Sequence, residues 1–103
     1  MDKSKALEFA QKYANEVTKV LAPSQIILYG SYAKGTQHDE SDIDIAVICD
    51  DFNGDLLETS SLLWRMTRNV SSYIEPILLD GMHDPSGFVE EIRRVGAVIY
   101  QHA

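Results

Sequence analysis

Asp42 and Asp44 are the residues of this chain whose types and spacing most directly indicate chemistry. They stand one residue apart at the start of the apolar run Ile43–Cys49. Alternate side chains of a β-strand point to the same face, so the two carboxylates share one face and the aliphatic side chains between them point to the other. Two adjacent ionised carboxylates repel each other, and a bound divalent cation such as Mg²⁺ relieves that repulsion. The pair alone is also consistent with two solvated aspartates in an acidic protein.

A glycine and a serine, Gly30-Ser31, follow the β-rich run Gln25–Tyr29. Glycine lets the backbone approach a ligand closely, and the N–H groups that open the next turn are able to receive a phosphate. The serine hydroxyl adds a donor. By itself the pair reads as an ordinary turn, but Gly-Ser, ten residues and then Asp-x-Asp is far more informative than either half.

The segment YGSYAKGTQHDESDIDIAVI resembles the signature of the DNA polymerase β-like nucleotidyltransferases, in the version found in minimal nucleotidyltransferase (MNT) domains. The resemblance rests on Gly30-Ser31 and on Asp42-Ile43-Asp44. Lys34 and Gly35 stand where these domains often have a basic residue and a glycine. Family members carry a third carboxylate on a later strand, and Glu75 in YIEPILL falls at that position, where many members have Asp.

This resemblance implies a nucleotidyltransferase fold of the α/β class, with a small mixed β-sheet flanked by α-helices, formed by residues 1–103 as a single domain. The implied reaction transfers a nucleoside monophosphate from an NTP, usually ATP, to an acceptor hydroxyl and releases pyrophosphate. Two Mg²⁺ ions would support it. The implied catalytic residues and metal ligands are Asp42, Asp44 and Glu75, with Glu75 also placed to act as general base. The implied nucleotide-binding residues are Gly30, Ser31 and Lys34.

The sequence does not identify the acceptor. Minimal family members are typically paired with a small helical HEPN-type protein, and in some pairs the MNT protein is an antitoxin that adds AMP to a toxin tyrosine. The resemblance therefore implies a protein acceptor and a homo- or hetero-oligomer. The alternatives are a non-enzymatic antitoxin-like binding module and transfer to a small molecule such as an antibiotic. Because all three carboxylates and the Gly-Ser pair are present, the enzyme is favoured.

Composition limits the classes of partner. The 103 residues carry a formal net charge of −7 with a pI near 4.7, which disfavours a long nucleic acid as ligand. No apolar stretch approaches the roughly 20 residues that a bilayer span needs, and the N-terminus has no signal-peptide pattern. The single cysteine, Cys49, lies in an apolar run and is expected to be a buried, inert thiol. These features favour the cytoplasm.

Periodicity and turn residues predict the elements that must position the site. A short loop between residues 30 and 42 permits an antiparallel return, and Pro76 indicates an edge strand. In chain order we expect a helix over residues 3–21, a strand over 25–29, a helical turn over 31–35, a polar loop over 36–42, a strand over 43–49, a helix over 55–70, a strand over 72–80, a helix from Asp84-Pro85 to Gly96 and a short strand over 97–100.

For the remaining polar and aromatic residues the sequence predicts ordinary structural positions. Trp64 is interpreted as a core residue or an interface anchor, and Arg65 and Arg68 as charges on a helix surface. His38 is expected to be solvated, and His83 shows no ligand-like spacing. The helix over 55–70 is expected to bury Leu56, Leu63, Met66 and Val70, and a solvated acidic rim is expected at Asp39, Glu40, Asp50 and Asp51.

Overall fold

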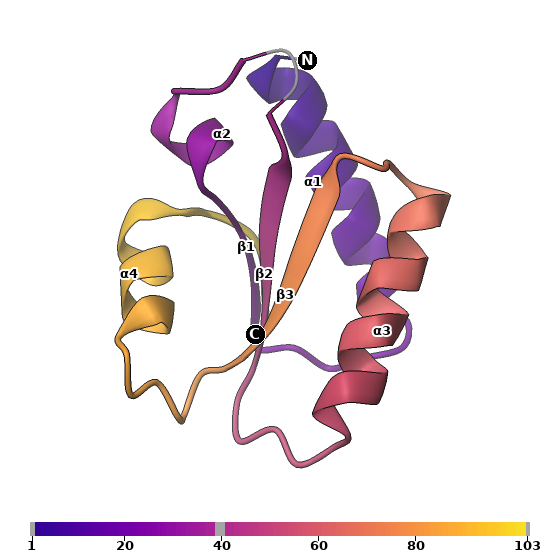
Figure 1. Ribbon diagram of the computed structural model, residues 1–103, viewed down its shortest axis with the longest axis vertical. Coiled ribbons are helices and arrows are strands. Elements are labelled where there is room, and N and C mark those ends of the chain that lie inside the picture. Colours follow the sequence, from indigo (N-terminus) through magenta and orange to yellow (C-terminus); the bar gives the residue numbers. More distant parts are fainter. Residues whose placement is uncertain (1, 39–40, 103) are drawn as a thin grey trace.

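The computed structural model describes residues 2–38 and 41–102, and Figure 1 shows how their helices and strands are arranged. Residues 39 and 40 of the predicted polar loop and acidic rim lie outside the described residues. In chain order the elements are α1 (Lys3–Val17), β1 (Gln25–Tyr29), α2 (Ser31–Lys34), β2 (Ile43–Cys49), α3 (Leu56–Met66), the 3-10 turn η1 (Thr67–Asn69), β3 (Ile74–Asp80), α4 (Phe88–Val95) and β4 (Ala97–Gln101).

The four strands form one mixed sheet in the order β3-β2-β1-β4. Strand β1 is antiparallel to both β2 and β4, while β2 and β3 run parallel. The antiparallel return between β1 and β2 and the mixed sheet are therefore confirmed. Strand β3 lies at an edge, as Pro76 predicted, because a residue without an N–H is tolerated where one side of the strand has no partner.

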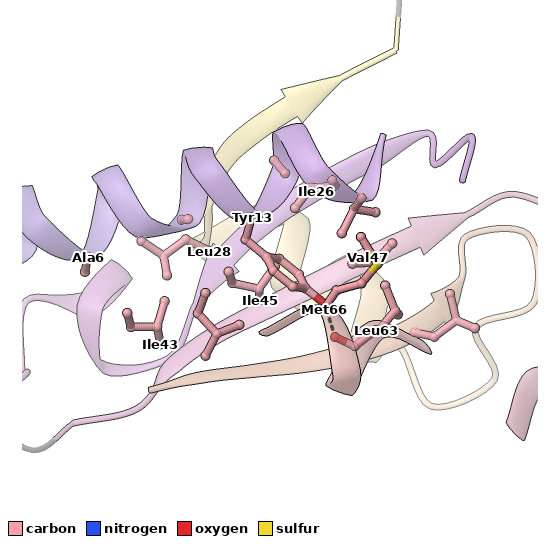
Figure 2. Close-up of a cluster of buried hydrophobic side chains, with 14 of the residues drawn as sticks. Ala6, Tyr13, Ile26, Leu28, Ile43, Ile45, Val47, Leu63 and Met66 are labelled. Carbon is pink, nitrogen blue, oxygen red and sulfur yellow. Dashed lines mark hydrogen bonds between the residues drawn. The ribbon is translucent and has the colours of Figure 1, made fainter. Parts of the chain in front are cut away.

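Helices cover both faces of the sheet (Figure 1). Helices α1 and α3 pack on one face, where their buried apolar side chains form one cluster with those of the strands. Helix α4 packs on the other face against β1 and β2. Figure 2 shows the α1–α3 core, in which the buried Tyr13 hydroxyl donates a hydrogen bond to the Leu63 carbonyl oxygen at 2.7 Å. The labelled core residues are Ala6, Tyr13, Ile26, Leu28, Ile43, Ile45, Val47, Leu63 and Met66.

Strands β1 and β2 have the bounds that the sequence predicts, whereas the helix ends differ. Helix α1 ends at Val17 and not at residue 21, because the Thr18 hydroxyl bonds back to the Ala14 carbonyl and the chain turns there. Helix α4 begins at Phe88 and not at Asp84-Pro85, because Gly87 adopts a positive φ of 77° and precedes the first helical residue. Asp84 still caps this helix from a distance, since its carboxylate accepts N–H bonds from the first turn of α4.

One prediction about helix α3 is wrong. Leu56 was expected in the core but is exposed at the first position of the helix. Trp64 is half exposed, which excludes a core role and leaves the interface anchor as a prediction. Leu63 and Met66 do face inward, so the helix buries a narrower stripe than expected. Cys49 is buried as predicted. None of the helices among residues 2–38 and 41–102 has the length and apolar character that a bilayer span requires.

Candidate active site

Glu75 lies beside Asp44 in the sheet. The parallel register of β2 and β3 pairs Asp44 with Glu75, and the antiparallel register of β1 and β2 pairs Asp44 with Tyr29. Because side chains at paired positions of neighbouring strands point the same way, the three side chains share one face. It is the face that α4 covers, since Ala46, two residues after Asp44, belongs to the cluster packed against that helix.

Gly30 leaves room for the Asp44 carboxylate. It connects Tyr29 to helix α2 with φ 74° and ψ −148°, a conformation open to glycine and strained for other residues. A Cβ atom built at Gly30 would overlap Asp44 Oδ2. The absence of a side chain at position 30 therefore places the backbone at the start of α2 directly against the carboxylate.

A pocket of about 320 Å³ opens on these carboxylates. Ser31, the first residue of α2, is half-buried beside it. The loop leading into β2 forms another wall, where the His38 N–H donates to the Ser41 hydroxyl at 2.8 Å and the Ser41 N–H donates to the His38 carbonyl at 3.0 Å. The lining residues are Ser31, Thr36, His38, Ser41, Asp42 and Asp44.

Of the six residues singled out from sequence, Ser31, Asp42 and Asp44 line this pocket, Gly30 adjoins the Asp44 carboxylate, and Glu75 is paired with Asp44 in the sheet. Asp42 is exposed just before β2, and Glu75 is exposed on β3. Lys34 is exposed at the end of α2 and is not among the residues that line the pocket. Sequence reasoning did not select Thr36 or Ser41. The sequence offers one signal for Ser41, which is its position immediately before Asp42. The structure adds that Ser41 is buried.

The carboxylates of Asp42, Asp44 and Glu75 repel one another when they are ionised. Burial raises the pKa of Asp44, and the negative charge of Asp42 raises it further. The pKa of Glu75 is raised first by desolvation and then by the charges of Asp42 and Asp44, with a hydrogen bond to Asp42 adding to the effect. Burial also raises the pKa of the Tyr29 hydroxyl, as do the charges of Asp44 and Glu75. The site therefore has an excess of negative potential, which a bound cation would neutralise.

The donor set fits a hard cation. Asp42, Asp44 and Glu75 offer carboxylate oxygens, which Mg²⁺ prefers, and no nitrogen or sulfur ligand lies in the pocket apart from His38. Among the described residues these three carboxylates are not a set whose ligand atoms all lie within 4.8 Å of one another, so holding one ion together requires a side chain such as the exposed Asp42 to change rotamer. These residues stand at the starts of β2 and β3. Figure 1 shows that both strands begin at the end of the sheet next to α2.

A second acidic cluster lies at the other end of the same strands. Within the described residues, Asp51, Asp80 and His83 are the set of three whose ligand atoms all lie within 4.8 Å of one another. The Asp80 carboxylate already accepts N–H bonds from the backbone of Asp51, Phe52 and Met82 at 2.9–3.0 Å. These bonds lower the pKa of Asp80 and tie two turns together, so the cluster has a structural explanation. The Asp51 side chain itself is exposed, as expected of the acidic rim, and lies 3.3 Å from the His83 ring nitrogen.

Comparison with known proteins agrees with this geometry. The chain matches the family profile "Polymerase beta, Nucleotidyltransferase" over residues 9–103. Its fold is similar to the 1.40 Å crystal structure of a Sulfolobus solfataricus protein, itself proposed to be a nucleotidyltransferase, with a TM-score of 0.74 and 19% identity over 97% of this chain and 84% of that one.

It is also similar to a chain of a toxin–antitoxin crystal structure determined with AMP-PNP, with a TM-score of 0.63 and 24% identity over 89% of this chain and 73% of that one. No curated protein sequence gives a significant match. The profile covers most of the chain, and the similar structure has the α/β fold built here around a four-stranded mixed sheet. The chain therefore belongs to the polymerase β nucleotidyltransferase family.

Proposed function

We propose that this protein transfers a nucleoside monophosphate, AMP from ATP, to a hydroxyl group of a partner protein. The observation that carries the proposal is the strand register, which sets Asp44 beside Glu75. Gly30, which has no side chain, leaves room for the Asp44 carboxylate, and an open pocket lies in front of Asp42 and Asp44. Family membership supplies the reaction class. The nucleotide, the metal and the acceptor belong to the proposal.

In this reaction the acceptor oxygen forms a bond to the α-phosphorus while the bond from that phosphorus to the pyrophosphate oxygen breaks. Asp42, Asp44 and Glu75 would hold Mg²⁺, which when bound neutralises the charge on the phosphates and the attacking oxygen. Ser31 lines the same pocket, and its hydroxyl would donate to the β- and γ-phosphates. In this way the chain orients the triphosphate in front of the carboxylates.

In this proposal Glu75 takes the proton from the acceptor. It lies on the edge strand β3 and is exposed, so a hydroxyl of a second molecule reaches it without crossing the nucleotide pocket. A carboxylate within hydrogen-bonding reach of an attacking hydroxyl acts as a general base. After transfer, the proton leaves Glu75 to solvent.

A protein acceptor is favoured over a small one. The pocket is open and, within the described residues, no second wall stands over Glu75 to enclose a small acceptor, so another molecule must complete the site. The similar toxin–antitoxin structure determined with AMP-PNP supports an antitoxin-like setting. A small helical HEPN-type protein with an acceptor tyrosine is the partner that we propose.

The test is nucleotide transfer measured by mass. The purified chain is mixed with Mg²⁺, one of the four NTPs and the product of a neighbouring gene, and the partner is weighed. We expect a mass increase of one AMP with ATP, loss of that increase in Asp44→Asn, and retention in Asp50→Asn, a matched exposed aspartate just beyond the far end of β2. Transfer that survives in Asp44→Asn would contradict the site, and tight binding without any transfer would favour a non-enzymatic antitoxin-like module.

A further inference from the structure

The outward side of helix α3 carries large apolar side chains. Leu57 is 78% exposed and Trp64 is 50% exposed, although both belong to a helix whose inner side is well packed. With the exposed Ser61 they lie on one side of α3, and the exposed Arg68 follows in the 3-10 turn η1 just beyond the helix. We call these four residues the α3 stripe, Leu57–Ser61–Trp64–Arg68; their spacings of four, three and four residues are those by which two helices pack along a common seam.

The charges next to the stripe have no partners of their own. Within residues 2–38 and 41–102, Glu58, Arg65 and Arg68 form no ion pair, whereas Arg93 and Arg94 pair with Asp50 and Glu91. Glu58 and Arg65 are seven residues apart, one residue after Leu57 and Trp64 respectively, so both lie along the same flank of the stripe.

We propose that the α3 stripe is an interface between two copies of this chain, packed with their α3 helices antiparallel about a two-fold axis. In that arrangement Leu57 lies opposite the aliphatic stem of the second copy's Arg68, and the small Ser61 lies opposite the large Trp64. Antiparallel packing brings identical flanks together, so Glu58 of each copy meets Arg65 of the other. The stripe therefore complements itself in size and in charge.

Other arrangements fit less well. A parallel pair of α3 helices would oppose Trp64 to Trp64 and Arg68 to Arg68, which leaves like charges in contact. A different protein would need matching large, small and charged side chains in the opposite order along its own helix. A second copy of this chain has them by symmetry. The net charge of −7 on each chain opposes association at long range, but salt screens this repulsion beyond about 8–10 Å.

One pair of short helices makes a small interface. It buries less than the roughly 800 Å² per partner of a standard interface, so we expect a weak dimer with a dissociation constant of about 10–100 µM. The test is sedimentation equilibrium of the whole chain at physiological salt, from about 1 to 500 µM, a range that brackets this constant. The average mass should rise from 11.6 kDa toward twice that value.

Substitutions test whether the α3 stripe forms the contact between the two copies. Trp64→Ser should weaken association by at least about tenfold, because buried aromatic residues at the centre of an interface dominate its energy. Val20→Ser removes an apolar side chain that is equally exposed, at 56%, but lies after α1, and it should leave association unchanged. Glu58→Arg and Arg65→Glu should each weaken the dimer, and the two changes together should restore it, because the swapped pair has the same complementarity.

Circular dichroism confirms that each variant is folded, which is expected because every altered side chain is exposed. A chain that stays at 11.6 kDa up to about 500 µM overturns the proposal, since this concentration exceeds the expected constant severalfold. So does a dimer that is insensitive to Trp64→Ser or is not restored by the double charge swap. A stripe that binds a different protein while the chain alone stays single also counts against a second copy as the occupant.

Discussion

Replacing Gly30 by alanine perturbs the point where the backbone touches the carboxylate of Asp44. The new Cβ meets two penalties. The conformation at position 30 is one that residues other than glycine rarely adopt, which costs about 1–3 kcal/mol. The Cβ also overlaps Asp44 Oδ2, and relieving such overpacking costs about 1–3 kcal/mol more. We therefore expect Gly30→Ala to lower the free energy of unfolding by about 2–6 kcal/mol.

Two other glycines provide matched controls. Gly35 and Gly87 also have positive φ values, 76° and 77°, but a Cβ at either position has no neighbouring heavy atom within 4 Å. Gly35→Ala and Gly87→Ala should therefore cost only about 1–2 kcal/mol, the penalty of the left-handed conformation itself. Urea unfolding followed by circular dichroism measures all three values under the same conditions.

Activity gives a second readout of the same contact. To accommodate the new Cβ, the Asp44 carboxylate must move, and displacement of a catalytic group by about 1 Å costs on the order of 10²-fold in rate. We expect Mg²⁺-dependent transfer from ATP to fall by about that factor in Gly30→Ala and to change little in Gly35→Ala.

The double variant Gly30→Ala/Asp44→Ala isolates the overlap. Removing the carboxylate removes the collision, so Gly30→Ala should cost less in the Asp44→Ala background, by the overlap part of about 1–3 kcal/mol. If the cost is the same in both backgrounds, or if Gly30→Ala and Gly35→Ala behave alike in stability and rate, the contact between position 30 and Asp44 does not constrain the site.

Two further predictions concern stability. Tyr13→Phe leaves the buried Leu63 carbonyl without its 2.7 Å donor and should lower the free energy of unfolding by about 1–3 kcal/mol, whereas Tyr73→Phe, at an exposed position, should have little effect; urea titration compares them. Asp84→Ala should destabilise the protein near pH 7, because backbone N–H groups of α4 and the charge of Arg93 hold the pKa of the folded carboxyl below its ordinary value. The stability that this ionised group provides is present above its unfolded pKa of about 3.9 and is lost as the pH falls through the folded pKa, so thermal melts of wild type and variant should converge below about pH 4, and a constant gap down to pH 2 would contradict this reasoning.

Local patterns in the sequence identify the strands well. Gln25–Tyr29 and Ile43–Cys49 have the expected bounds because turn residues flank each apolar run, and Pro76 correctly places β3 at an edge. The helix ends are less accurate. The start of α4 depends on the conformation of Gly87 and on the carboxylate of Asp84, and neither is visible as periodicity.

The features of the site that the sequence did not predict depend on tertiary contacts. Glu75 was singled out by resemblance, but its position beside Asp44 follows from the parallel register of β2 and β3, which no local pattern determines. The need for glycine at position 30 comes from a side chain fourteen residues later in the chain. Leu56 is a true error, because periodicity put it on the inward face, whereas α3 buries only Leu63 and Met66; for Trp64 the sequence left core and interface open, and the structure excludes the core.

The candidate active site and the α3 stripe lie on opposite faces of the sheet, which separates the two proposals experimentally. Asp44 and Glu75 share the face covered by α4, while α3 packs with α1 on the other face (Figure 1). A second copy seated on α3 therefore leaves the pocket and the edge strand accessible to a nucleotide and an acceptor. Trp64→Ser should weaken self-association by at least about tenfold and leave transfer per chain within about twofold of wild type, since no group that touches substrate moves. If transfer falls in parallel with the dimer, the second copy contributes to the site, and the acceptor approaches from the α3 face.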